Sequence, residues 1–497
     1  MRTALKLTGG IITLLVVLFI ITIIVLTNVV NPNDYRKNID SYVFHKTGRH
    51  LVIGKVAWSF IPWLGVDLKK VQLTNPSGFK GPNLANIDEV KIKMRFWPLL
   101  TGSVQFGKIV VTHADINLVT NSAGKQNWSA WSKAATHHQT RSKAPTSTPK
   151  APIRQLQIAG IRVIDSTIKV MNQKTRTTTL LSDFNLNTGA INNAQNFPLT
   201  ASFNLQQRNA KNSTFITAHA RANFDLQRQI YKITHTVITT KTRRPNLPVL
   251  MSNLKGTMII NLPAQTLTFS PLAAQIANMN INARLQINQL LHTPRINLTV
   301  SSHDTALQPF ITKLQGKSQL KGTLSFNTAI TTSGASSKAL LANLNGKGNM
   351  TITNGVIAGI NLNNLLAVGN AIIHQQSAPP QRQGWLQTSF SSLSGTYVIH
   401  NGVLRNNDLR LIAGQVGAHG AGTVNLNGNT IINYVLTAEY RSTADTTQPL
   451  AVPIIIRGSL FHPSIKPDYG NIAKQVLTNA LQKHGGHLNL NTLFKGL

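Results

Sequence analysis

The residues that could perform chemistry are few and scattered. The chain has 14 Asp and Glu residues and no cysteine, which excludes thiolate nucleophiles, disulfides and thiolate metal sites. Asp88 and Glu89 are neighbours in sequence, so on a strand their carboxylates would point to opposite faces and would make a poor acid–base pair. The sequence contains no Gly-x-Ser-x-Gly elbow, P-loop or His-Glu-x-x-His motif. It therefore predicts a protein that is not an enzyme and has no catalytic residues.

Two further groups of residues could hold a metal or a nucleotide. His137 and His138 are adjacent, but no third ligand lies near them in the sequence, so we expect solvated histidines and no metal site. The glycines at 346–348 and 417–422 resemble nucleotide-binding loops, yet the strand-to-helix context that such loops need is missing. We therefore expect turns at these glycines and no cofactor.

The charge balance constrains the partners. Lys and Arg number 49, and the formal net charge is +35. A field of that sign attracts anionic surfaces such as phospholipid headgroups, lipopolysaccharide or nucleic acid. The basic residues are scattered, so a compositional bias and a functional patch both stay open. Aromatic residues make up only 6% of the chain and no recognition-helix motif accompanies the charge, so nucleic acid is not expected as a partner.

An uncharged apolar stretch covers residues 7–30, and Arg2 and Lys6 precede it. At about 1.5 Å per residue it is long enough to cross a hydrocarbon core of roughly 30 Å. A cleavable signal peptide is the alternative, but its apolar region would be about half as long and would end in small residues. We expect an uncleaved transmembrane anchor, with residues 1–6 in the cytoplasm and the rest of the chain exported.

After the anchor the pattern changes from helical to alternating. Asn31 and Pro32 favour a helix start and Gly48 a helix end. Tyr35, Ile39, Tyr42 and Val43 share one face of this helix, which favours packing on a sheet, and a position on the bilayer surface is the alternative. From residue 51 apolar and polar residues alternate, which predicts strands. In residues 90–96 the apolar side chains share one face and Lys or Arg the other.

Strands then recur about every 10 to 15 residues with hardly a helix between them, which predicts antiparallel pairing. Residues 362–373 have helical periodicity, and a closing helix is expected from about residue 468 to 483. These elements divide the chain into a cytoplasmic tail (1–6), a transmembrane anchor (7–30), an N-terminal β region with its lead helix (31–132), a disordered basic linker rich in Lys, Thr, Ser and Pro (133–152), a central β region (153–345), a C-terminal β region (346–470), and a C-terminal helix and tail (471–497).

Several segments resemble the AsmA family of Gram-negative cell envelopes. The resemblance is carried by residues 31–39 (NPNDYRKNI), 46–79, 84–111 and 121–130, and it returns at 344–366, 395–411 and 452–472. It is most specific at Thr47-Gly48-Arg49 and in the segment WSFIPWLG that starts at Trp58. Residues 155–340 match in pattern only. Asn361 stands where the family usually has Asp, whereas Asp408 is retained.

The resemblance implies a fold, a location and a role. Members are distantly similar to TamB-like and chorein-type bridge proteins, in which a long, curved antiparallel β-sheet forms an apolar groove, so the expected fold class is mainly β. It also implies an inner-membrane protein whose bulk lies in the periplasm and takes part in outer-membrane biogenesis. The implied partners are phospholipids, moved between the inner and outer membranes, and the outer membrane or an envelope protein at the C-terminal end.

A half-apolar sheet suits lipid movement because acyl chains in water cost about 0.8 kcal/mol per CH₂. Strands with their apolar residues on one face can replace the bilayer as a lining.

From the alternation alone, a closed sandwich core is the preferred interpretation, and the family resemblance reverses this preference. The competing function is a non-transporting assembly factor or scaffold for the outer membrane. The candidate lining residues of the groove are Val90, Ile92, Met94, Phe96, Leu267, Phe269, Leu285, Ile287, Leu324 and Phe326.

Overall fold

The structure is a computed structural model that forms two units, Met1–Pro245 and Asn246–Leu497. Among the residues it describes, no helix is both long and apolar enough to cross a membrane. The predicted anchor, the basic linker and nearly all of the closing helix lie outside these residues. The described residues are 31–59, 64–94, 106–128, 158–208, 210–290, 293–373, 376–377, 386–427, 431–441, 450–459, 462–468 and 470.

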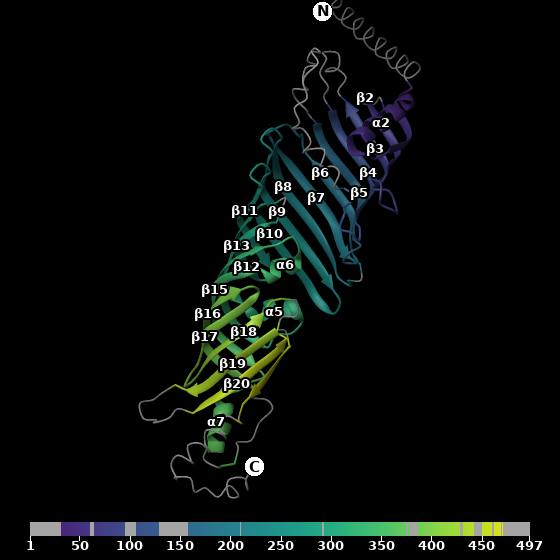
Figure 1. The fold of residues 1–497 in the computed structure, drawn as a ribbon. Helices are drawn as coiled ribbons and strands as arrows, with labels where there is room; N and C mark the ends of the chain where they lie inside the picture. The colour runs from purple at the N-terminus through teal and green to yellow at the C-terminus, as the bar shows by residue number, and fades with distance from the viewer. Residues whose placement is uncertain are drawn as a thin grey trace, which may run out of the picture. The chain divides into compact units, whose positions relative to one another are not determined.

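The first unit is a helical lead followed by a sheet (Figure 1). The lead consists of a 3-10 turn, η1, and helix α2, and each strand of the sheet pairs with the next strand in the chain. The elements are η1 (Pro32–Tyr35), α2 (Arg36–Thr47), β1 (Leu51–Ser59), β2 (Leu64–Leu73), β3 (Ala85–Met94), β4 (Phe106–Thr120), β5 (Ile158–Asn172), β6 (Thr177–Thr188), β7 (Asn196–Gln207), β8 (Ser213–Asp225) and β9 (Ile230–Arg244).

The second unit is also built on a sheet of sequentially paired strands, and its described residues include three short helices between strands. The elements are β10 (Leu247–Asn261), β11 (Thr266–Ile276), β12 (Met279–Asn288), β13 (Arg295–Ala306), α5 (Leu307–Gln315), β14 (Leu320–Ser333), α6 (Ser337–Ala342), β15 (Asn345–Ala358), α7 (Leu362–Ile373), β16 (Gln387–His400), β17 (Val403–Ala413), β18 (Val416–Asn425), β19 (Ile431–Tyr440), β20 (Ala451–Ser459) and β21 (His462–Pro467).

The predicted all-antiparallel pairing is wrong at one place. Strands β4 and β5 run parallel, with Phe106 opposite Ile158 and Thr120 opposite Asn172. A short hairpin forces antiparallel pairing, but the long connection from residue 121 to 157 allows the chain to return to the edge from which β4 started. Every other registered pair within the two units is antiparallel.

The lead helix begins and ends where the sequence predicts, but its packing face is narrower than predicted, since Tyr35 and Tyr42 are 53% and 66% exposed. The Asn31 side chain accepts a hydrogen bond from the Asn33 N–H, and Gly48 ends α2 in the left-handed region at φ 67°. Ile39 packs on a small cluster around Ile53, Val56 and Val71. The helix therefore lies on the start of the sheet, although none of its own residues is fully buried.

Bulges bend the strands of the first unit. Non-glycine residues with positive φ occur inside strands, at His113 (48°), Asp165 (43°), Asp183 (52°) and His235 (50°). The register shifts beside Asp165 and Asp183, between Val163 and Ser166 and between Ser182 and Asn185. Bulges of this kind increase the local twist and bend the strand, and Asp, Asn and His tolerate the left-handed conformation best. Several of the dispersed acids thus serve the curvature of the sheet.

The glycines that were expected in turns lie inside strands. Gly346 and Gly348 belong to β15, and Gly417, Gly420 and Gly422 to β18. A Cβ on Gly348 would lie 2.6 Å from the Tyr397 ring, and one on Gly420 2.8 Å from the Tyr434 ring. Each of these two glycines leaves room for an aromatic side chain of a neighbouring strand, which the sequence pattern alone does not show.

Candidate functional site

One row of apolar side chains crosses the whole sheet of the first unit. Residues opposite each other in a β-ladder point to the same face, so the row follows from the printed registers. Polar residues such as Arg162 and Asn187 occupy the other face, because neighbouring side chains on a strand alternate. From β1 to β9 the row is Val56, Leu68, Val90, Val111, Val163, Leu186, Ala201, Ala218 and Ile238.

We call the face that carries this row the inner face. Further apolar residues lie beside the row, since Val66 pairs with Ile92, Ile92 with Ile109, and Ile109 with Ile161. On its other side, Ile116 pairs with Ile168. The inner face is therefore apolar over a strip more than one residue wide.

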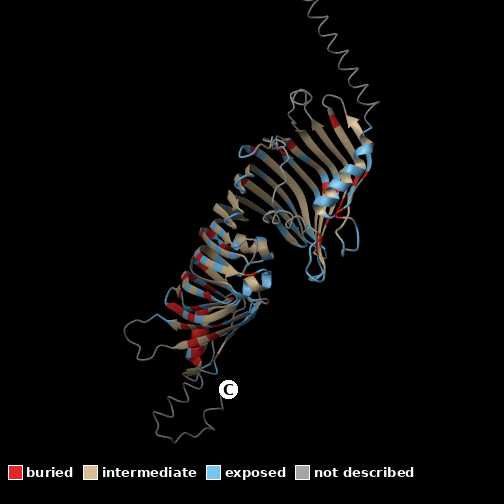
Figure 2. Cartoon of the chain, turned by 45° about the horizontal axis from the view of Figure 1, so that its top comes forward, coloured by how far each residue is buried: buried red, intermediate tan, exposed pale blue. Residues whose placement is uncertain are grey.

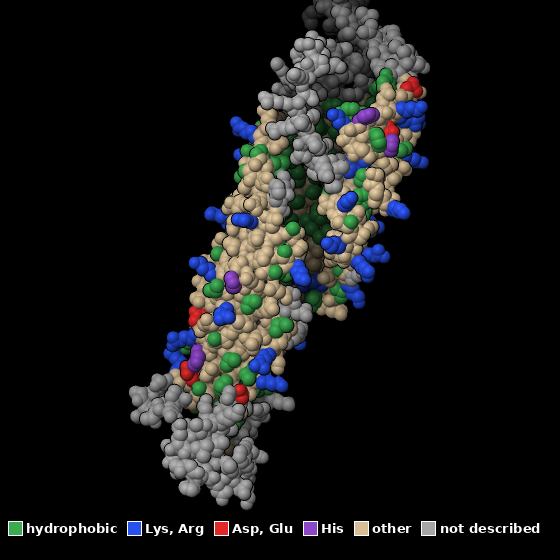
Figure 3. Space-filling model, viewed as in Figure 1, with side chains coloured by type: hydrophobic (Ala, Val, Ile, Leu, Met, Phe, Trp, Pro, Cys, Tyr) green, Lys and Arg blue, Asp and Glu red, His purple; other side chains and the backbone are tan. Residues whose placement is uncertain are grey.

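The inner face is not a packed core. Val56 is buried, but the other members of the row are half-buried (Figure 2). Figure 3 shows a hollow over the strands of this unit, with hydrophobic side chains on its floor. Among the described residues of this unit, the helical lead makes its main contacts with β1, and no described helix lies over β4 to β9 (Figure 1). Apolar side chains that are neither covered nor fully solvated are what a hydrocarbon ligand needs.

Only part of the predicted lining lies in this unit. Val90 is a member of the row, and Ile92 lies beside it on the inner face. Met94 ends β3, and its side chain and all of Phe96 lie outside the described residues. Of the nine members of the row, the sequence prediction named only Val90. In β5 and β6 the alternation changes phase at the bulges, so a search that allows a phase shift at Asp165 and Asp183 would have placed Val163 and Leu186.

The second unit brings four predicted residues together. Leu267 pairs with Ile287 and Phe269 with Leu285, and all four are half-buried. Phe326 shares their face two strands further on. Leu285 pairs with Leu298 and Leu298 with Ile330, and Phe326 lies four residues before Ile330 on the same strand, hence on the same face. This part of the second sheet thus repeats the half-buried apolar face of the first unit.

Leu324 belongs to a different environment. It pairs with Ile352, which is 4% exposed, and packs against the main hydrophobic core. That core continues through Leu393, Leu411, Ala418, Ala438 and Val452 on the same face, and α7 covers it with Leu362, Leu365 and Leu366. At this end of the second unit the apolar face is closed by the protein's own helix.

Asn361, where the family usually has Asp, has a structural role. Its Oδ1 accepts a hydrogen bond from the Asn364 N–H at 3.0 Å, in the first turn of α7. Thr388 Oγ1 supports the same end by accepting from the Leu362 N–H at 3.1 Å. Asn and Asp are about equally good at capping a helix N-terminus, so this substitution preserves the cap and removes only a charge.

Arg49 and Asn127, from the family-like segments, form a buried corner. Both are 0% exposed. Arg49 Nη2 donates to the Asn127 carbonyl oxygen at 2.6 Å, and Asn127 Oδ1 accepts from the Val119 N–H at 2.9 Å. Burial lowers the pKa of Arg49. This corner ties the turn after α2 to the end of β4.

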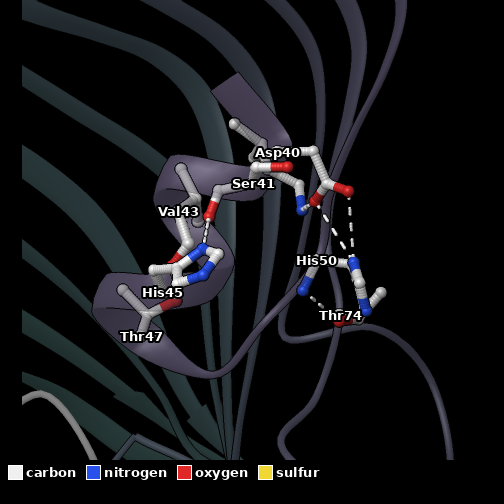
Figure 4. Close-up of polar contacts among 8 residues, drawn as sticks. Asp40, Ser41, Val43, His45, Thr47, His50 and Thr74 are labelled. Atoms are coloured by element: carbon white, nitrogen blue, oxygen red, sulfur yellow. Dashed lines mark hydrogen bonds and ion pairs between the residues drawn. The ribbon is translucent and has the colours of Figure 1, made fainter. Parts of the chain in front are cut away.

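Polar contacts also hold α2 at the edge of the sheet (Figure 4). Asp40 Oδ1 accepts from the Leu51 N–H at 2.8 Å, and Asp40 Oδ2 lies 3.2 Å from His50 Nδ1. These hydrogen bonds, from Leu51 first and then from His50, hold the pKa of Asp40 below its usual value. The His50 N–H donates to Thr74 Oγ1 at 3.0 Å. The Asp40 and His50 contacts therefore position the lead helix.

Asp408, which the family retains, holds a bulge between β16 and β17. Its carboxylate accepts from the Thr396 N–H at 2.8 Å and from Thr396 Oγ1 at 2.7 Å, and these bonds lower its pKa. Asn406 Nδ2 donates to Asp408 Oδ1 at 2.7 Å, and Tyr434 donates to Asn406 Oδ1. Burial, with the nearby Asp408 charge, raises the pKa of Tyr434 to about 12.

The candidate site is therefore an extended surface and not a cluster of polar groups. In the described part of the chain, no group of three or more His, Asp or Glu residues could hold a metal ion. His137 and His138 lie outside that part. The arrangement that stands out is the inner face, which can bury hydrocarbon and leave polar groups in water.

Comparison with known proteins gives one match. A model of the AsmA family matches residues 1–290 and 243–409. Neither the curated proteins nor the solved structures include a significant match to this chain.

Proposed function

Because the chain belongs to the AsmA family, we propose that it carries phospholipid acyl chains along the inner face, as a step of lipid movement between the inner and outer membranes. The supporting observation is the row of half-buried apolar side chains that crosses every strand from β1 to β9. The anchor at residues 7–30 and the periplasmic location of the sheets are parts of this proposal.

The energetics set what such a surface must do. A phospholipid has about 30 CH₂ groups, so full exposure of its tails costs on the order of 25 kcal/mol. That barrier prevents passage through water on a useful timescale. An apolar strip removes most of this cost, and the headgroup can stay hydrated at the open side of the hollow. Such movement is passive and needs no catalytic residue.

A scaffold role in outer-membrane assembly is the second candidate, and the core under α7 favours it. A closed, well-packed apolar face has no room for lipid, and here it occupies the β15–β20 part of the second sheet. A scaffold would act in outer-membrane assembly as a rigid element and would not carry lipid. The two candidates differ in whether the inner face of the first unit is ever occupied by lipid.

A transfer assay separates the two functions. The full chain is reconstituted in donor vesicles, and movement of a fluorescent phospholipid to acceptor vesicles is followed. We expect Leu186→Asp, on the inner face, to reduce transfer about 10-fold, because a carboxylate in an apolar lining must be desolvated. Asn187→Asp introduces the same charge one residue along, on the outer face, and should transfer like the parent. Equal transfer by both variants, or none by the parent chain, would favour the scaffold.

A further inference from the structure

The two rims of the first unit differ in charge. We define the basic rim as the edge formed by the β5–β6 turn, the β7–β8 turn and the end of β9. The registers bring these ends together, since Asn172 is opposite Thr177, Thr179 opposite Gln207, and Ser213 opposite both Gln206 and Arg243. The basic rim carries Lys174, Arg176, Arg208, Lys211, Arg243 and Arg244.

The opposite rim consists of the β6–β7 and β8–β9 turns. Residues 189–195 contain no charged side chain, and residues 226–229 contain only Arg228. Arg228 Nε lies 3.9 Å from Asp225 Oδ2, at the end of β8. Between β5 and β9, one rim is therefore strongly positive and the other nearly neutral.

The Lys and Arg residues of the basic rim belong to turns that hydrogen bonds hold in place. The N–H groups of Lys174 and Thr175 both donate to Asn172 Oδ1, at 3.0 and 3.1 Å. The Arg208 N–H donates to the Thr178 carbonyl oxygen at 2.7 Å. Lys174, Arg176, Arg208 and Lys211 are exposed, and none of the ion pairs found among the described residues involves them.

The turns of the basic rim are close enough for their positive charges to reinforce one another. Alternate turns on one edge are two strands apart, or about 10 Å, which is close to the Debye length at physiological salt. The positive fields of neighbouring turns therefore overlap along the rim.

We propose that the basic rim binds the anionic headgroups of amphiphiles whose tails lie on the inner face. The occupant is one molecule with two parts: a hydrocarbon tail for the inner face beside the rim, where Ile168 pairs with Leu181 and Leu181 with Leu205, and a phosphate or carboxylate for the Lys and Arg side chains. The asymmetry of the rims fixes the orientation, with headgroups toward the β5–β6 and β7–β8 turns. This proposal rests on the proposed function and adds to it the class of headgroup and the rim of the sheet that binds it.

Matched amphiphiles test this on the full chain. Dodecyl phosphate and dodecylphosphocholine share a tail and differ in net charge, and inorganic phosphate supplies the anion without a tail. We expect the chain to bind dodecyl phosphate about 10-fold more tightly than dodecylphosphocholine at low salt, with the preference shrinking as salt rises. Inorganic phosphate should bind far more weakly than either amphiphile.

Two variants with equal loss of charge locate the effect. Changing Lys174, Arg176, Arg208 and Lys211 together to Gln should abolish the preference and leave the affinity for dodecylphosphocholine unchanged. The control changes Lys321, Lys338, Arg405 and Arg410 of the second unit to Gln, and should keep the preference.

The outcomes distinguish the two proposals. Equal binding of the two amphiphiles by the parent chain, a preference that survives in the basic-rim variant, or phosphate binding as tight as dodecyl phosphate binding would overturn the headgroup site and leave the groove standing. Failure of both amphiphiles to bind would overturn the groove as well.

Discussion

The inner face of the first unit and the C-terminal end of the second unit share the same alternating sequence pattern, but one is a half-buried surface and the other a closed core. In both, alternating strands place apolar residues on one face, in rows that run from strand to strand. In the first unit the row from Leu68 to Ile238 stays half-buried. In the second, Leu366 of α7 and Ile454 of β20 are both 0% exposed because α7 packs on the sheet.

The difference shows that alternation alone does not determine whether an apolar face is a core or a binding surface. Among the described residues, the two faces differ in whether a helix covers them. The segment 362–373 carries apolar residues at helical spacing and packs on β16, β19 and β20. Helix α2 covers only the start of the first sheet and is positioned largely by polar contacts from Asp40 and His50.

Truncating a leucine in each region should give the largest difference. Leu366→Ala removes buried atoms and leaves a cavity, so the free energy of unfolding should fall by about 3 kcal/mol. Leu186→Ala removes atoms that are already partly solvated, so its loss should be at most about 1 kcal/mol. Urea unfolding of the full chain, with hydrogen exchange read in peptides of each unit, measures both. Equal losses would mean that the inner face is as well packed as the core.

The buried corner of the first unit should give the next largest effect. Arg49→Met keeps much of the side-chain volume and removes the hydrogen bond to the Asn127 carbonyl oxygen, for an expected loss of about 2 kcal/mol. Lys55→Met, at an exposed position of β1, is the control. If both substitutions cost the same, the corner does not hold the first unit together.

The cap of α7 tests how the core is closed. Asn361→Ala should lower the free energy of unfolding of the second unit by about 1 kcal/mol, because the Asn364 N–H loses its acceptor. Asn361→Asp should change it by less than about 0.5 kcal/mol, in the stabilising direction, since a negative charge favours a helix N-terminus. A large loss in the Asp variant would show that the family's carboxylate does not suit this chain.

The last effect is confined to alkaline pH. The folded pKa of Tyr434, about 12, is above its unfolded value of about 10. The stability that Tyr434 contributes is therefore complete below pH 10 and is lost as the pH rises toward 12. The difference in unfolding free energy between the parent chain and Tyr434→Phe should shrink over this interval. A constant difference would indicate that the phenol ionises alike in both states.

Much of this fold follows from the sequence, and the exceptions have physical causes. The helix at 362–373 and the strands at 281–287 and 296–300 are confirmed because their periodicity is unbroken. The β4–β5 pairing could not be predicted, since local pattern does not say where a long connection returns. Helices α5 and α6 were missed because they are short and lie between strands.

The sequence predicted an apolar lining but not which of its residues lie on an open face. Alternation identified Val90 and Ile92 and the cluster of Leu267, Phe269, Leu285 and Ile287. It could not show that Leu324, which is also half-buried, packs against the core, because such contacts depend on what covers the face. Whether any of the candidates contacts lipid is still a prediction.

The most direct test of the account is photo-crosslinking at two adjacent positions of β6. A benzophenone side chain is placed at Leu186 or at Asn187 in the full chain, expressed in membranes and irradiated. The account predicts covalent phospholipid adducts at 186, on the inner face, and none at 187, on the outer face. Adducts at both positions, or at neither, would contradict the claim that the inner face carries acyl chains.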